Sequence, residues 1–110
     1  MSSSNTAPNT TWVIDQNEPS EPSEVELTVQ ERGKDYGHFK EGARIMQELK
    51  NTIYTGESWE QLSEAQAEAL HMICHKMGRI VNGNLNHRDS WLDIAGYATL
   101  IVQLLDGENP

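Results

Sequence analysis

The chain has 110 residues, with 8 Lys or Arg against 17 Asp or Glu and a formal net charge of −9. That length allows one domain at most, and the acidic balance excludes a protein that binds a bare nucleic-acid backbone, which requires clustered Lys and Arg. The single cysteine, Cys74, excludes an intrachain disulfide and a thiolate zinc site, and we expect it to be a reduced core residue. The sequence has no apolar run of about 18 residues and no signal peptide, so we expect no membrane contact and a cytoplasmic location.

Residues 1–23 are rich in Ser, Asn, Thr, Pro and Glu, a composition typical of a disordered or extended acidic tail. Trp12, Val13 and Ile14 interrupt this tail as a short apolar island. The island is either a collapsed part of the tail or an anchor that docks on a groove of this protein or of a partner.

Residues 24–107 are expected to form an all-α domain, a small helical bundle of three main helices with a short helix before them. Ser23 has the right side chain to cap a first helix over residues 25–32, and Gly33 is the expected stop.

A turn over residues 34–39 leads into a second helix over residues 40–54. Arg44 and Glu48 have the i,i+4 spacing of an ion pair on that helix.

Ser63 and Gln66 have the spacing of a capping box at the start of a third helix. Helical periodicity continues from there to Val81, and the Asn-Gly-Asn sequence at 82–84 is expected to end the helix.

The last helix begins near Asp89 or Ser90 and runs to about Leu105. Projected at 100° per residue, it carries two clusters on opposite sides. The cluster that we expect to face the core comprises Trp91, Ile94, Ala98, Val102 and Leu105. The other comprises Asp89, Asp93, Gly96 and Leu100. Because its second half is apolar on both sides, the helix is typical of the centre of a bundle or of a subunit interface, so we expect a homo-oligomer.

Asp89 and Asp93, one helical turn apart, have two interpretations. Acids in a first turn are favoured by the helix dipole and need no further role. Carboxylates at this spacing are also suited to a hard cation such as Mg²⁺, which prefers oxygen ligands. Gly96 lies on the same stripe, where a glycine costs roughly 1 kcal/mol and therefore indicates the close approach of another group. Tyr97, beside this stripe, is a candidate to stack on a base or sugar.

Basic side chains near the loop at 82–84 are candidates for binding phosphate or ribose. They are His75, Lys76, Arg79 and Arg88. In a helical hairpin, Arg79 and Arg88 would lie close to the two aspartates. The alternative is a cluster of ion pairs that holds the third helix against the fourth.

Two weaker candidates remain. Tyr36, Gly37 and His38 are either a nucleotide-facing turn or part of a loop whose Phe39 packs onto the second helix. Glu68, His71 and His75 have the spacing of a transition-metal site, although the same stripe is also explained as an ordinary polar helix face.

Three blocks of sequence carry a family resemblance: KDYGHF at 34–39, KMGRI at 76–80 and HRDSWLDIAGYATL at 87–100. Over residues 31–105 their pattern, YG-x-F, K-x-x-R and RDS-x-x-D-x-AGY-x-x-L, resembles a family of small, mostly phage-encoded proteins of uncharacterised function. That family is similar to the all-α, MazG-like nucleoside triphosphate pyrophosphohydrolases, which are oligomeric, Mg²⁺-dependent enzymes that split NTPs into NMP and pyrophosphate.

The resemblance implies that Asp89 and Asp93 occupy the place of the E-x-x-D pair in the last helix of those enzymes. Their earlier E-x-x-E pair has no clean match here, because the second helix offers Glu41 and Glu48, which are too widely spaced. We take Asp89, Asp93, Glu41 and Glu48 as the candidate metal ligands.

We therefore expect a phage-type, nucleotide-binding helical protein related to Mg²⁺-dependent pyrophosphohydrolases, with the incomplete acid set leaving its enzymatic activity undecided. The candidate nucleotide-binding residues are Lys34, Tyr36, His38, His75, Arg79, Arg88 and Tyr97. The alternatives are a non-enzymatic phage protein that binds and inhibits a host protein, and a protein that sequesters a nucleotide against host defence. For a phage protein, the expected location is the host cytoplasm.

Overall fold

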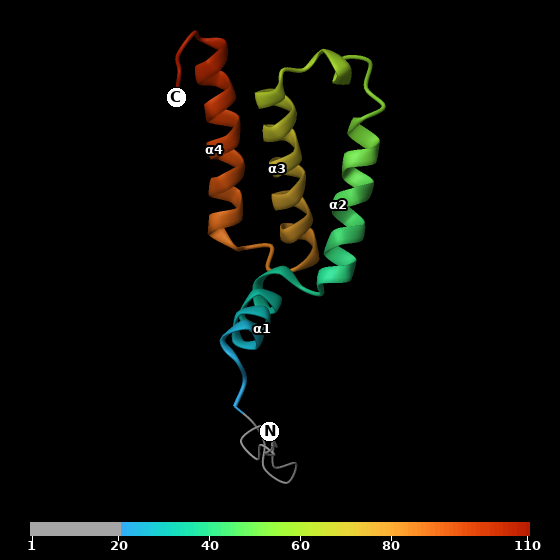
Figure 1. Ribbon diagram of the computed structural model, residues 1–110, viewed down its shortest axis with the longest axis vertical. Helices are drawn as coiled ribbons and strands as arrows, with labels where there is room; N and C mark the ends of the chain where they lie inside the picture. Colours follow the sequence, from blue (N-terminus) through green and yellow to red (C-terminus); the bar gives the residue numbers. More distant parts are fainter. Residues whose placement is uncertain (1–20) are drawn as a thin grey trace, which may run out of the picture.

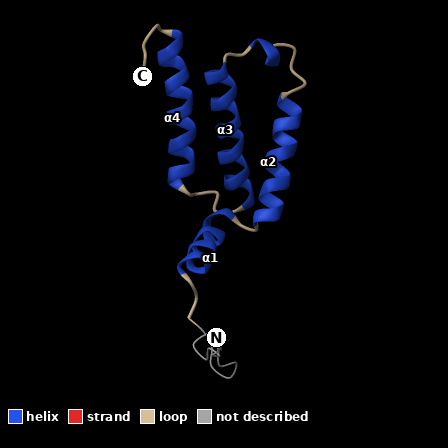
Figure 2. Ribbon diagram, viewed as in Figure 1, coloured by secondary structure: helices blue, strands red, loops and turns tan. Residues whose placement is uncertain are grey.

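A computed structural model describes residues 21–110, which contain four α-helices, one short 3-10 helix and no strand (Figure 2). The helices are α1 (Glu24–Tyr36), α2 (Phe39–Ile53), α3 (Glu64–Asn82) and α4 (Arg88–Leu105), with the 3-10 helix at Trp59–Gln61. The predicted all-α fold class is confirmed. The predictions for the tail before residue 21, including the apolar island at 12–14, lie outside the described residues.

Two of the helices begin where the sequence predicts. The Ser23 hydroxyl accepts a hydrogen bond from the Glu26 backbone N–H at 3.1 Å and caps α1. Ser63 and Gln66 form the predicted reciprocal capping box at the start of α3. These caps satisfy backbone N–H groups that a helix leaves unpaired in its first turn.

The predicted stop of α1 at Gly33 is wrong, because the helix continues to Tyr36. The residue that ends it is Gly37, whose φ of 76° lies in the left-handed region that glycine adopts without strain. A Cβ atom at Gly37 would lie 2.1 Å from the carbonyl oxygen of Asn82. The stop is therefore set by the contact with the end of α3, which local sequence does not reveal.

Helices α2, α3 and α4 lie side by side as one layer, with α3 in the centre and α1 at one end (Figure 1). Gly78 allows α2 and α3 to approach closely, since a Cβ there would lie 2.6 Å from Cγ of Met46. Within the described residues, the buried apolar side chains are Ala69, Cys74 and Ile80, all on the central helix. The expected core position of Cys74 is confirmed.

Most of the predicted core face of α4 is wrong, with the half-buried Ile94 as the exception. Trp91, Val102 and Leu105 are 54%, 55% and 71% exposed. The less exposed residues of α4 include Ser90, Tyr97 and Ile101, which lie between the two clusters of the helical projection, and Ile94, which lies at the edge of the Trp91 cluster. Among residues 21–110, α3 lies on one side of α4 and no other helix covers the cluster that contains Trp91.

None of the helices within residues 21–110 combines the length and the apolar composition that a membrane span requires.

Candidate functional site

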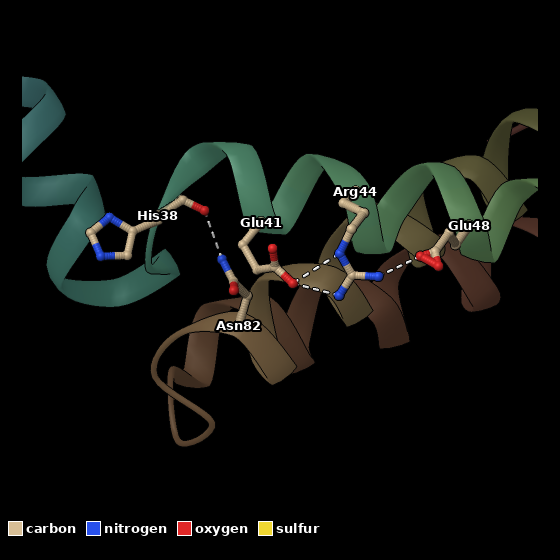
Figure 3. A network of polar contacts seen from close by, with 5 residues as sticks. All are labelled: His38, Glu41, Arg44, Glu48 and Asn82. Atoms are coloured by element: carbon tan, nitrogen blue, oxygen red, sulfur yellow. Dashed lines mark hydrogen bonds and ion pairs between the residues drawn. The ribbon is translucent and has the colours of Figure 1, made fainter.

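The turn between α1 and α2 is bound to the C-terminal end of α3 by one side chain. The Asn82 amide nitrogen donates a hydrogen bond to the Tyr36 carbonyl at 2.9 Å. It donates a second one to the His38 carbonyl at 3.0 Å (Figure 3). The turn is therefore held in place, and the Tyr36 side chain is positioned relative to α3.

Tyr36 lies between α3 and the loop that precedes α4. The guanidinium carbon of Arg79 is 4.5 Å from the Tyr36 ring centre, a cation–π arrangement. The ring of His87 meets the same tyrosine edge-on, with 5.4 Å between the centres. The structure thus brings together Tyr36 and Arg79, two of the residues predicted to contact a nucleotide.

Lys76 and Asp93 join α3 to α4, with 2.8 Å between the ammonium nitrogen and a carboxylate oxygen. The Lys76 side chain is only 13% exposed, so most of its stem is covered and its charge depends on this partner. This is the kind of contact expected if ion pairs hold the third helix against the fourth, and Asp93 takes part in it.

His75 lies in a cationic environment. Burial lowers the pKa of its imidazole below the ordinary value, and the positive charges of Lys50, Arg79 and Lys76 lower that pKa further. Lys50 was not predicted as a site residue, because it comes from α2 and reaches His75 only through the antiparallel packing of α2 on α3. The residues around Lys50 in the sequence contain no motif that predicts this contact with α3.

One side of the helical layer carries all of these groups. On α3, Gly78 faces α2 and Lys76 reaches toward α4, so His75 and Arg79 project from the side between those two directions. Lys50 of α2 and Asp93 of α4 approach the same side. We call the surface of Lys50, His75, Lys76, Arg79 and Asp93 the polar face.

The other predicted nucleotide-binding residues lie outside the polar face or at its margin. Lys34 is in α1 and pairs with Glu31 at 3.6 Å. Arg88 is exposed at the start of α4, and Tyr97 is half-buried further along the same helix. His38 is exposed and takes part in the fold through its backbone carbonyl, as described above.

The predicted metal ligands are not brought together. Glu41 and Glu48 both bind Arg44 on α2, which confirms the predicted Arg44–Glu48 pair (Figure 3). Hydrogen bonding and the charge of Arg44 lower the pKa of Glu41. Asp89 and Asp93 are on α4, across the central helix from α2, and only Asp93 has an ion-pair partner.

No group of three or more His, Cys, Asp or Glu side chains within residues 21–110 is arranged to hold a metal ion. The acids that the structure describes in one chain therefore do not fit the Mg²⁺ site that the resemblance implies. The transition-metal alternative also lacks support, since His71 Nε2 lies 2.9 Å from the Tyr54 hydroxyl. Within the described part of the chain, no atom lies within 4 Å of a Cβ added at Gly96, so the predicted close approach of another group is not seen there.

A Ser-His-Asp constellation occurs at the start of α4 but is not suited to nucleophilic catalysis. His87 Nδ1 is 3.0 Å from the Ser90 hydroxyl, and its Nε2 is 3.8 Å from an Asp35 carboxylate oxygen. Ser90 is 2% exposed, so a substrate cannot reach its hydroxyl. These contacts instead fix the loop before α4 against the end of α1.

Comparison with known proteins places the chain in a family. No curated protein and no solved structure matches it. The family model "Domain of unknown function (DUF6378)" matches residues 23–105, which span α1 to the end of α4 and include every residue of the polar face. The chain belongs to the DUF6378 family.

Proposed function

We propose that the polar face binds the phosphate groups of a nucleotide or of a similar small phosphorylated molecule. The observation that carries this proposal is that Lys50 and Arg79 both lie near His75 on the polar face, beside the Lys76–Asp93 ion pair, in a chain whose net charge is −9. In so acidic a protein, a cluster of positive charge is an electrostatic minimum for an anion.

The chemistry of the cluster suits phosphate. Arg79 has planar N–H donors for bidentate contacts with oxyanions, while Lys50 supplies a compact positive charge. The lowered pKa of His75 keeps its imidazole neutral at physiological pH, so it can donate one hydrogen bond and accept another. Tyr36 holds Arg79 from behind, which limits the freedom that the guanidinium loses on binding.

Calorimetric titration tests the proposal with linear nucleotides, cyclic nucleotides and inorganic phosphate, each with and without Mg²⁺. Replacing either Lys50 or Arg79 by alanine should weaken binding about tenfold or more, as expected for the loss of a charge-assisted hydrogen bond. Arg44→Ala is the matched control, because Arg44 is an exposed cation on α2 whose partners are Glu41 and Glu48. Equal effects of Arg44→Ala and Arg79→Ala, or no binding to any of these ligands, would refute the proposal.

Hydrolysis of the bound nucleotide, which the family resemblance implies, is a separate arm of the same experiment. NMP and pyrophosphate are measured after incubation of NTPs and dNTPs with Mg²⁺, for wild type and for the Asp89→Ala/Asp93→Ala variant. Product that depends on both aspartates would support a pyrophosphohydrolase. Binding without product would support sequestration of the nucleotide.

A further inference from the structure

We propose that the side of the layer opposite the polar face is the surface on which a second copy of this chain docks. Its position follows from the contacts that orient each helix. On α4, Asp93 lies on the side of the polar face. The residues beyond the stripe that contacts α3 therefore lie on the opposite side of the layer. These residues are Trp91, Ala98, Val102 and Leu105.

The other two helices continue this surface. On α3, the residues opposite His75 and Arg79 are Leu70, Met77 and Val81. On α2, Lys50 lies on the polar side, and the residues across the contact with α3 are Ile45 and Leu49. We call the surface formed by the named residues of α2, α3 and α4 the apolar face.

The exposed area matches what a stable dimer buries. Six residues of the apolar face are large and well exposed: Leu70, Met77, Val81, Trp91, Val102 and Leu105. Their exposed areas sum to on the order of 600–700 Å², which approaches the roughly 800 Å² per partner that a standard interface buries.

The small number of buried side chains also favours a partner. Only three apolar residues are buried within the described part of the chain, and none of its large side chains is fully buried. A single layer of helices with so little buried area gains little free energy to oppose the conformational entropy of the chain. Covering the apolar face would turn one layer into two, with a hydrophobic interior between them.

The distribution of charge favours a second copy as the occupant. Two chains of net charge −9 repel each other, yet none of the residues that we assign to the apolar face is charged. On α2, the acids Glu41 and Glu48 are paired with Arg44. Two copies can therefore meet face to face around a two-fold axis without placing like charges in contact.

The chain's own N-terminal segment is a poorer candidate. Its apolar island consists of Trp12, Val13 and Ile14, and these three side chains are too few to cover residues spread over three helices. A dimer formed through the apolar face would leave both polar faces directed outward. Self-association is thus independent of the proposed nucleotide binding, and either can fail without the other.

Sedimentation equilibrium of the full chain over a wide concentration range tests the proposal. Wild type should have twice the 12.4 kDa mass of one chain. Val81→Glu and Val102→Glu should each weaken association at least tenfold. Leu100→Glu is the matched control, because Leu100 is also exposed and lies two residues from Val102 on the opposite side of α4. It should leave the dimer intact.

A dissociated chain has little core, and the glutamate variants can therefore unfold. For this reason the milder Val81→Thr and Val102→Thr variants are measured as well, together with the thermal unfolding of wild type. The wild-type unfolding temperature should rise with protein concentration, as mass action requires for a folded dimer. Wild type that is monomeric at all concentrations would overturn the proposal and point to the N-terminal segment or a foreign protein as the occupant. A dimer unaffected by substitutions at Val81 and Val102, or equally weakened by Leu100→Glu, would also overturn it.

Discussion

The guanidinium carbon of Arg79 lies 4.5 Å from the centre of the Tyr36 ring, joining the end of α1 to the last turn of α3. Through this contact a residue of the KDYGHF block orients a residue of the KMGRI block. The tyrosine also receives the edge of His87, which belongs to the third block of the family pattern. The three blocks are thus distant in sequence and adjacent in space, at the end of the polar face.

Replacing Tyr36 by leucine should remove both aromatic contacts and lower the free energy of unfolding by about 1–2 kcal/mol, from lost cation–π interaction and lost packing. Tyr36→Phe keeps the ring and should remain close to wild type. Urea unfolding measures both variants. If Tyr36→Phe proves as unstable as Tyr36→Leu, the stabilisation comes from the hydroxyl and the ring contacts contribute little.

The two glycines near the end of α1 should respond in opposite ways to alanine. Gly37→Ala would force a Cβ into the Asn82 carbonyl at a positive φ, and should cost more than about 2 kcal/mol. Gly33 is helical with no atom within 4 Å of an added Cβ, so Gly33→Ala should stabilise by about 0.5–1 kcal/mol. Thermal unfolding of the pair distinguishes them. Equal effects would mean that the turn does not contact α3 as described.

Local signals in the sequence predicted the helices well, because caps and periodicity act over a few residues. Ser63 and Gln66 predicted the start of α3 correctly, and the second helix was displaced by only one residue at each end. Gly33 failed as a stop because a glycine ends a helix only where the following chain must turn. That requirement came from Asn82, far away in the sequence.

The orientation of α4 could not be predicted for a related reason. The helical projection placed an acidic and an apolar cluster on opposite sides of α4, but hydrophobicity alone does not distinguish a buried face from an exposed one. Likewise, Arg79 and His75 were predicted from their place on the third helix near the loop at 82–84, whereas Lys50 comes close to them only through the packing of α2 on α3.

The two aspartates of α4 should differ in their contribution to stability. Asp93→Asn would leave the largely covered Lys76 without its ionic partner, which should cost about 1–2 kcal/mol. Asp89 is exposed in the first turn and gains only from the helix dipole, so Asp89→Asn should cost under about 1 kcal/mol. A double-mutant cycle of Asp93→Asn with Lys76→Met would isolate the coupling between them. A coupling near zero would show that the pair does not hold α3 against α4.

His75 should make the stability of the protein depend on pH below neutrality. Burial, followed by the charges of Lys50, Arg79 and Lys76, lowers the pKa of His75 in the folded chain below its ordinary value. As pH falls through that ordinary value of 6.5, the unfolded chain takes up a proton that the folded chain still resists. The free energy of unfolding therefore decreases from this value down to the lowered pKa, and His75 contributes no slope at higher pH.

The measurement is urea unfolding of wild type and His75→Asn between neutral and mildly acidic pH, since other groups titrate equally in both. The difference in the free energy of unfolding between wild type and His75→Asn should be constant above neutrality. At acidic pH, wild type should lose stability relative to His75→Asn. Inorganic phosphate bound among Lys50, Lys76 and Arg79 would offset their positive charges, so adding it should reduce that acidic loss. A parallel decline of both proteins would show that His75 is not held neutral. If only wild type loses stability at acidic pH and phosphate has no effect, His75 does lie in a cationic environment, but phosphate does not bind there.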